Sequence, residues 1–220
     1  MNIECPLCKN STTNIFFKKR LWDLKYMSCE NCSFVFMEPS KRLDFSKEKA
    51  DYDLHQNDPC DEGYRNFLSK LVKELLPFLS PRERYKNALD FGCGPGPTLN
   101  LLFEEIGIST EIYDPIYFDH QKNLNKKYDL VSCSEVVEHF YDPAQGFASL
   151  VRLLRPGGIL GIMTDLFQKD RDFERWHYIR ERTHVSFYSK ECFLWIAKEY
   201  TLNLLYQDAR VVIFKADQQS

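Results

Sequence analysis

Four cysteines near the N-terminus have the type and spacing of a metal site. Cys5 and Cys8 form one C-x2-C pair, and Cys29 and Cys32 form a second pair, with twenty residues between the two pairs. In a reducing compartment, such pairs are typical of tetrahedral zinc binding rather than of disulfide bonds. Four thiolates leave no open coordination position, so the spacing predicts a structural zinc ion and not a catalytic one.

The residues around these cysteines are expected to form a small β ribbon. Strand-like apolar runs occupy residues 15–17, 24–27 and 34–36. About forty residues bury too small a core to fold alone, so metal binding is expected to hold the ribbon together. Lys9 and Ser33 follow the second cysteine of each pair, where glycine is common in such turns.

Three glycines stand between a short apolar strand and an amphipathic helix. Gly92, Gly94 and Gly96 follow a predicted strand at 88–91 and precede a helix that Thr98 is expected to cap and Gly107 to end. A strand, a glycine turn and a helix in this order are typical of the first unit of a nucleotide-binding α/β fold, where backbone lies close to the ligand. The spacing differs from the G-x-G-x-x-G of dinucleotide-binding folds.

Asp114 ends the next predicted strand, at 110–113, and lies 22 residues beyond Gly92. A carboxylate at about this distance can accept the hydroxyl groups of a ribose. An amphipathic helix is predicted from Tyr64 to Leu79, ended by Ser80-Pro81. The remaining strands are predicted at 128–132, 159–163, 202–206 and 211–214, the last two as a hairpin. The order predicts an α/β fold with a doubly wound, Rossmann-like sheet.

Four motifs together resemble class I S-adenosylmethionine-dependent methyltransferases, over about residues 64–216. They are L-D-F-G-C-G-P-G, I-Y-D-P, Y-D-L-V-S-C-S-E-V-V-E-H and L-L-R-P-G-G-I-L-G-I. The resemblance implies that Asp114 binds the ribose and that Asp90 lies near the ammonium group of the cofactor. It also implies that the methionine moiety lies over Gly92, Cys93, Gly94 and Gly96. The four-cysteine ribbon further resembles that of certain sugar C-methyltransferases.

The connection between Asp114 and Tyr128 is shorter than the family usually has. Either residues 123–126 form a vestigial third strand, or the adenine is held by other groups. Tyr52 and Tyr64 offer aromatic faces to a cationic sulfonium, and Arg65 is a candidate for the cofactor's carboxylate. For Tyr64 the alternative is simple packing of its helix.

Glu135, Glu138 and His139 share one face if they lie on a helix. A similar motif in ubiquinone-pathway O-methyltransferases is implicated in holding a divalent cation. The favoured alternative needs no cation: Glu135 contacts the cofactor, and His139 orients the loop.

Residues 165–189 form the expected substrate region, because they follow a strand at the carboxyl edge of the sheet and are rich in aromatic side chains. His177 and His184 are candidate general bases there, together with His139. The alternative is a structural role, with aromatic side chains packing a lid and His184 bonded to backbone.

The expected organisation is a zinc ribbon at 1–38, a linker at 39–62 that is partly helical, and a methyltransferase domain at 63–216. With 29 basic and 32 acidic residues, a net charge of -3 does not favour nucleic acid as a partner. The N-terminal residues lack a secretory apolar region, and no apolar stretch is long enough to cross a membrane, so a cytoplasmic protein is expected.

The predicted function is methyl transfer to an oxygen or carbon atom of a small molecule. The alternatives are an RNA or protein methyltransferase that uses the ribbon for recognition, and a catalytically silent module that binds the cofactor.

Overall fold

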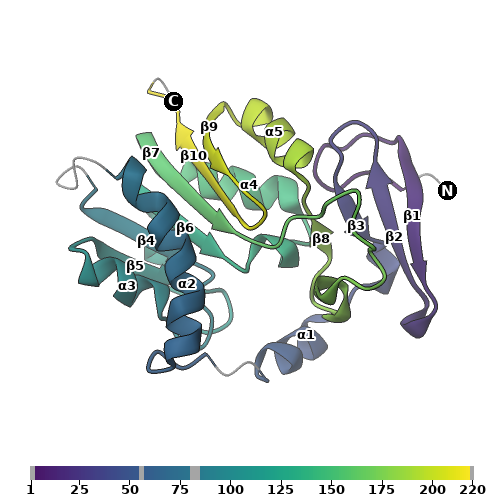
Figure 1. Cartoon of the computed structure of the whole chain (residues 1–220), viewed down its shortest axis with the longest axis horizontal. Coiled ribbons are helices and arrows are strands. Elements are labelled where there is room, and N and C mark those ends of the chain that lie inside the picture. The colour runs from purple at the N-terminus through teal and green to yellow at the C-terminus, as the bar shows by residue number, and fades with distance from the viewer. Residues whose placement is uncertain (1–2, 55–56, 80–84, 219–220) are drawn as a thin grey trace.

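A six-stranded sheet with helices on both faces forms the centre of the molecule, and a smaller sheet packs beside it (Figure 1). The computed structural model describes residues 3–54, 57–79 and 85–218. The strand order of the central sheet is β5-β4-β6-β7-β10-β9. Its strands are β4 (Asn87–Phe91), β5 (Ser109–Tyr113), β6 (Tyr128–Ser134), β7 (Leu154–Met163), β9 (Leu202–Gln207) and β10 (Val211–Ala216).

The first four strands are parallel, and β10 pairs antiparallel with both β7 and β9. This is the predicted doubly wound sheet with a C-terminal hairpin. The helices are α1 (Phe45–Tyr52), α2 (Glu62–Leu75), α3 (Leu99–Glu105), α4 (Pro143–Arg152) and α5 (Lys190–Glu199). Short 3-10 turns are η1 (Leu21–Asp23), η2 (Pro39–Lys41), η3 (Leu76–Phe78), η5 (Gln121–Asn125), η6 (Val137–His139) and η7 (His177–Arg180).

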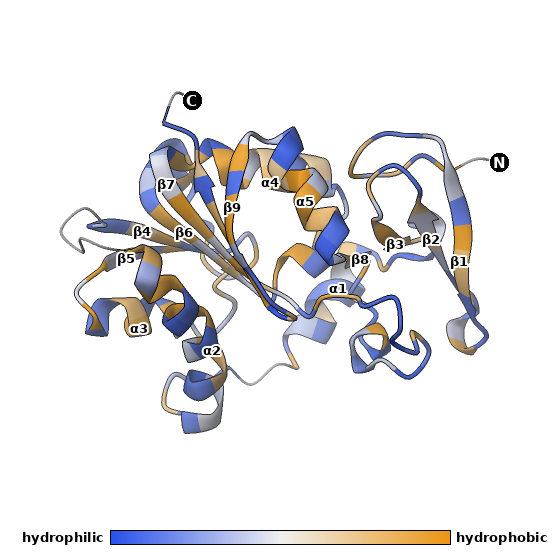
Figure 2. Ribbon diagram, turned by 45° about the horizontal axis from the view of Figure 1, so that its top comes forward, coloured by the Kyte–Doolittle hydropathy of each residue, from blue (hydrophilic) through white to orange (hydrophobic). Residues whose placement is uncertain are grey.

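The central strands carry apolar residues on both faces because both faces of the sheet are covered. Leu130 packs in the core beneath α2 and α3, whereas its neighbour Val131 packs in the core beneath α4 and α5. Ile159 and Leu160 divide in the same way on β7. Figure 2 shows this apolar character at the middle of the sheet. The two cores fix the carboxyl ends of β4, β5 and β6, where the predicted site residues lie.

The predicted ribbon strands are confirmed as β1 (Thr13–Lys19), β2 (Leu24–Cys29) and β3 (Val35–Met37). The sequence did not indicate the fourth strand of this sheet, β8 (Ser186–Phe187), which lies about 150 residues further along the chain and pairs antiparallel with β3. Val35 lies opposite Phe187 in this pairing. The ribbon sheet therefore includes part of the predicted substrate region.

The prediction of a vestigial third strand at 123–126, one of the two alternatives, is wrong. Gln121–Asn125 forms the 3-10 turn η5 instead. The buried Asn123 side chain donates to the carbonyl of Ile112 on β5 at 3.1 Å, so a side-chain amide covers a group that a third strand would have paired. β5 is consequently the edge of the sheet.

Other local expectations hold in part. α1 confirms that the linker region is partly helical, and Gly107, with φ of +84°, ends α3 as predicted. Thr98 stands at the N-cap position, but its hydroxyl donates to the carbonyl of Gly96 and not to the helix. The Ser80-Pro81 stop lies outside the described residues. In the described part of the chain, no helix is long and apolar enough to cross a bilayer.

Candidate functional site

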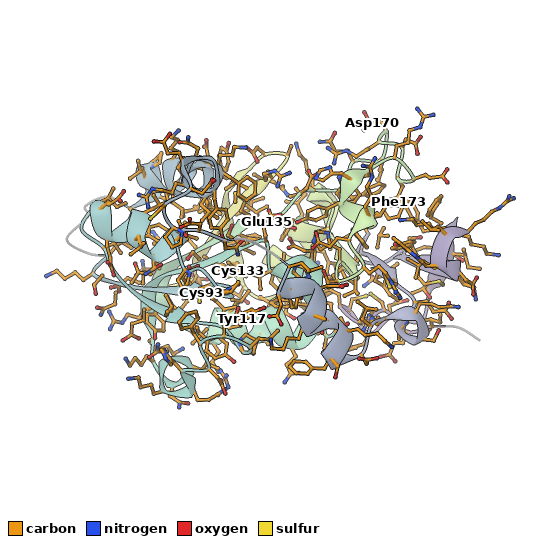
Figure 3. All side chains as sticks on the ribbon, turned by 90° about the horizontal axis from the view of Figure 1, so that it is seen from below. Cys93, Tyr117, Cys133, Glu135, Asp170 and Phe173 are labelled. Atoms are coloured by element: carbon orange, nitrogen blue, oxygen red, sulfur yellow. The ribbon has the colours of Figure 1, made fainter. Side chains whose placement is uncertain are left out.

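A cavity of about 640 Å³ opens at the carboxyl ends of β4, β5 and β6. Its walls come from segments far apart in the chain, among them α1, α2, the loops after the three strands, and residues 177–184. Figure 3 shows Cys93, Tyr117 and Glu135 near the middle of the molecule. Of the predicted residues, those that line it are Tyr64, Gly92, Cys93, Gly94, Asp114, Glu135, His139, His177 and His184.

The glycine turn is shaped for close approach of another group. Gly94 has φ of +66°, in the left-handed region that favours glycine. A Cβ atom on Gly96 would lie 1.6 Å from the carbonyl oxygen of Asn57, a residue from the segment before α2. Gly96 therefore lies beneath Asn57 and does not line the cavity, whereas Gly94 lines it.

The Asp114 carboxylate links the loop after β5 to the loop after β4. Its Oδ2 accepts from the backbone N–H of Gly94 at 3.0 Å, and its Oδ1 accepts from Ile116 and Tyr117 at 2.8 and 3.0 Å. These bonds occupy three of the roughly four acceptor positions of a carboxylate, which leaves room for a ribose hydroxyl.

Asp90 is buried behind the glycine turn and does not line the cavity. The Ser132 hydroxyl donates to its Oδ1 at 3.1 Å. Burial raises the pKa of Asp90 to about 7, because desolvation disfavours the charged form. A cation at this end of the cavity would offset that cost.

Tyr64 and Tyr52 both line the cavity, from α2 and α1 respectively. Burial raises the pKa of Tyr64 to about 12, so the phenol stays neutral and presents an aromatic ring. Arg65 bonds Glu105 at 2.5 Å and does not line the cavity.

A buried hydroxyl among the residues that line the cavity also fits the binding of an adenosyl cofactor. The Ser134 Oγ atom is buried and has no hydrogen-bond partner among the described residues, and Ser134 lines the cavity. A buried hydroxyl without a partner costs free energy that a ligand can recover. Sequence analysis missed Ser134 because the motif that contains it, at residues 128–139, does not indicate which of its hydroxyls faces the cavity.

Glu135, Glu138 and His139 do not share a helix face, so that expectation is wrong. Glu135 has φ of +52° and lies outside η6, which covers only Val137–His139. Ligand atoms of Glu138, His139 and His184 lie within 4.8 Å of one another, and Glu135 is not in this group. The Glu135 carboxylate pairs instead with Arg210 at 3.2 Å.

Tyr178 joins the two glutamates. Its hydroxyl donates to Glu138 and lies 3.2 Å from Glu135 Oε2, and the Thr164 hydroxyl donates to the second oxygen of Glu138 at 3.0 Å. Burial raises the pKa of Glu135 to about 7, and it also raises the pKa of the fully buried Glu138 well above its ordinary value. The network holds the substrate-region loop against β6 and β7.

His139 and His184 lie side by side, with ring centroids 4.8 Å apart. The Nδ1 atom of His139 is 3.1 Å from the carbonyl of Thr183, and that of His184 is 2.8 Å from the carbonyl of Tyr178. Because a carbonyl only accepts, each Nδ1 carries the proton and each Nε2 is left as an acceptor in the neutral ring. His177 differs: its side chain is 63% exposed at the rim, 3.9 Å from Asp165.

Three further residues that sequence analysis left out of the site line the cavity: Phe45 and Glu48 on α1, and Arg210 before β10. Arg210 contacts Glu135 at 3.2 Å and Asp165 at 3.8 Å. These residues come from a linker and a hairpin turn, whose positions depend on tertiary packing and not on a local pattern.

The four N-terminal cysteines converge as predicted. Their Sγ atoms lie within 4.8 Å of one another, with Cys5–Cys32 at 3.7 Å and Cys8–Cys29 at 3.4 Å. A tetrahedral zinc ion with Zn–S bonds of about 2.3 Å requires a sulfur spacing of about 3.8 Å, so the set fits zinc.

The turns that carry these cysteines have matching backbone. Lys9 and Ser33 have φ of +58° and +56°, and their N–H groups donate to the carbonyls of Cys5 and Cys29. Both turns thus form without the glycine that is common there.

Comparison with known proteins agrees with the fold. Residues 61–207 match the family described as "Methyltransferase domain". Over 90 residues the chain is 29% identical to a ubiquinone biosynthesis O-methyltransferase of Aeromonas salmonicida, a match that covers 41% of this chain and 38% of the relative. A protein of the same name from Yersinia pestis is 33% identical over 70 residues, covering 32% of this chain and 29% of that protein. The matches thus span well under half of these relatives.

Two solved structures share the fold. The putative sarcosine dimethylglycine methyltransferase of Galdieria sulphuraria has a TM-score of 0.54 at 14% identity, covering 79% of this chain and 99% of the other. A SAM-dependent methyltransferase of Archaeoglobus fulgidus has a TM-score of 0.51 at 17% identity, covering 69% and 94%.

Proposed function

The chain belongs to the family of methyltransferase domains, and we propose that it transfers the methyl group of S-adenosylmethionine to an oxygen or carbon atom of a small-molecule acceptor. One observation carries the proposal: a single cavity is lined by the glycine turn and Asp114 and also by His139 and His184. Its volume of about 640 Å³ suits small-molecule ligands. The partial similarity to proteins named as O-methyltransferases supports an oxygen acceptor.

When bound, S-adenosylmethionine supplies an electrophilic methyl group on a sulfonium centre. The Gly92–Gly94 backbone would admit the methionine moiety, Asp114 would accept a hydrogen bond from a ribose hydroxyl, and the ionised form of buried Asp90 would attract the ammonium group. Tyr64 presents an aromatic ring toward positive charge. Ile116 and Tyr117, which line the cavity just beyond Asp114, take the adenine in place of a residue from a third strand.

One of two neighbouring imidazoles, His139 or His184, accepts the single proton that the methyl acceptor loses. Their Nδ1 atoms face backbone carbonyls, so Nε2 is the basic atom of each ring. Glu181 Oε2 lies 3.4 Å from Nε2 of His184 and stabilises that ring once it is protonated. We assign direct contact with the acceptor to His139, because its ring lies between those of Tyr52 and His184 on the cavity wall, and the exposed His177 has a role only at the rim.

No divalent cation is needed at Glu135, Glu138 and His139 in this proposal. The oxygens of Glu138 already accept from the hydroxyls of Tyr178 and Thr164, and Glu135 is paired with Arg210. Addition of Mg²⁺ to the turnover assay should leave the rate unchanged, and a rate that depends on the ion would favour the cation instead.

We further propose that Cys5, Cys8, Cys29 and Cys32 bind one structural zinc ion. The spacing of their sulfur atoms and the paired turns at Lys9 and Ser33 support this assignment. Since all four positions are thiolates, the ion stabilises the ribbon and takes no part in the chemistry.

An RNA acceptor has one observation in its favour. The basic run Lys18–Arg20 lies beside Arg180 and Trp22 around a second, more open cavity. RNA binding that weakens steeply with salt would support this second candidate.

The primary test is calorimetric titration with S-adenosylmethionine and with S-adenosylhomocysteine, followed by a turnover screen over phenols, sugars and amines. Binding of both cofactor forms and release of the demethylated form with some acceptor are the expected results. Absence of binding would overturn the proposal. Binding without turnover of any acceptor would favour the catalytically silent module.

A further inference from the structure

The helix α1 presents one face to the cavity. Phe45, Glu48 and Tyr52 stand at positions i, i+3 and i+7, and all three line the cavity. His139 packs against this wall, with its ring 5.1 Å from that of Tyr52. Glu48 therefore lies on the same side of the cavity as the proposed base.

The carboxylate of Glu48 has no cationic partner among the described residues. The Tyr52 hydroxyl donates to its Oε1 at 3.1 Å, and the Tyr141 hydroxyl also hydrogen-bonds to the carboxylate, so both of these donors are neutral. The lysines on either side are engaged elsewhere: Lys47 pairs with Asp44 and Lys49 with Asp53, each at 2.7 Å. Burial raises the pKa of Glu48 despite the hydrogen bonds from the two tyrosines, because desolvation disfavours the charged form.

The described residues that line the rest of the cavity offer no uncommitted lysine or arginine to an anionic acceptor. Arg210 is the only lysine or arginine among the described residues that line it, and it is committed to Glu135 and Asp165. Asp114 adds a carboxylate beside the glycine turn. Aromatic side chains, including Tyr52 and Phe140, supply the remaining wall and favour a cation over an anion.

We propose that the methyl acceptor carries a protonated amine and that Glu48 binds this group on the α1 wall. The inference rests on the proposed function and deepens it, since it names the charge class of the acceptor. Glu48 thereby determines specificity, whereas the methyl group goes to another atom of the acceptor, near His139.

Three phenols of nearly equal size test the proposal, because they differ only in charge at the end of a two-carbon side chain. They are tyramine, tyrosol and 4-hydroxyphenylacetate, which are cationic, neutral and anionic at pH 7. Each is titrated into the full chain saturated with S-adenosylhomocysteine. Tyramine is expected to bind at least tenfold more tightly than tyrosol, and 4-hydroxyphenylacetate most weakly.

The variant Glu48→Gln keeps the size of the side chain and removes the charge. It should reduce the preference for tyramine over tyrosol about tenfold, which corresponds to about 1.4 kcal/mol. Asp51→Asn is the matched control, since it removes the same charge from α1 at a residue that does not line the cavity. The preference of Asp51→Asn for tyramine over tyrosol should equal that of the unmodified chain.

Several outcomes overturn the inference. Two concern the unmodified chain: it binds 4-hydroxyphenylacetate as tightly as tyramine or more tightly, or it does not bind tyramine at millimolar concentration. Two concern the variants: Glu48→Gln keeps the preference for tyramine over tyrosol, or Asp51→Asn loses as much of that preference as Glu48→Gln does. Binding of S-adenosylhomocysteine is measured separately in every protein. If the unmodified chain does not bind S-adenosylhomocysteine, the proposed function itself is contradicted. If Glu48→Gln still binds it, the variant is folded.

Discussion

The carboxylate of Asp114 accepts a hydrogen bond from the backbone N–H of Gly94 at 3.0 Å. Asp114, which directly follows β5, therefore also fixes the glycine turn that follows β4. Asp114→Asn keeps the size of the side chain but weakens both this bond and the bond to a ribose. We expect affinity for S-adenosylhomocysteine to fall about 10- to 100-fold, as for loss of a charged hydrogen bond. Calorimetry checks this, with the exposed Asp119→Asn as control. If the affinity for S-adenosylhomocysteine is unchanged in Asp114→Asn, Asp114 does not bind the cofactor.

Gly94 lines the cavity with φ of +66°. Gly94→Asp places a side chain in the path of the cofactor and should abolish binding while the fold persists. Gly107→Asp separates this effect from backbone strain, because Gly107 has φ of +84° and open space around it. Both variants should lose about 1 kcal/mol of stability from the left-handed backbone, but only Gly94→Asp should lose the cofactor. Equal affinities in the two variants would contradict the placement of the cofactor.

Asp90 should make stability depend on pH. Its folded pKa of about 7 lies above the ordinary value of 3.8, so the folded state disfavours the charged form. The resulting cost is absent below about pH 4, grows as the pH rises to 7 and is complete above that. Asp90→Asn should therefore raise the thermal midpoint more at pH 8 than at pH 5 in the absence of cofactor, and should weaken cofactor binding. An equal shift at both pH values would mean that Asp90 does not titrate in this range.

The role of the histidines is tested by turnover. His139→Gln should reduce kcat about 10²- to 10⁴-fold, the usual contribution of a general base, with affinity for S-adenosylhomocysteine within twofold. His177→Gln is the control, because that side chain is exposed at the rim. If the two variants lose activity equally, His139 has no special role in proton transfer.

The cysteine cluster predicts one zinc ion per chain by elemental analysis. Cys29→Ser should lose the metal and lower the thermal midpoint, because structural zinc contributes on the order of 10 kcal/mol to folding. Cys60→Ser changes an exposed cysteine outside the cluster and should alter neither quantity. Metal retained at full occupancy in Cys29→Ser would exclude the four-thiolate site.

The parts of the fold that depend on local pattern were predictable from the sequence. The strands β4 to β7 follow from short apolar runs, the glycine turn from its composition, and the cysteine cluster from two matched pairs. Asp114 was identified because a strand end sets its position at a known distance from the glycines.

The parts that depend on tertiary contacts were not predictable. Glu135 was placed on a helix, but φ of +52° turns it away from η6, and no glycine or asparagine marks that conformation. The Asn123 amide covers the edge of β5 in place of a strand. Glu48 and Arg210 reach the cavity from segments whose sequences carry no motif for it.

The pairing of β3 with β8 binds the ribbon to the chain just after His184. Phe34 of the ribbon also contacts Tyr188, which leads into α5. The N-terminal segment is thus not a detachable module: exchanging it for the ribbon of a relative would disturb the segment just after His184, which lines the cavity. Metal uptake and substrate choice should therefore change together in any chimera made at this boundary.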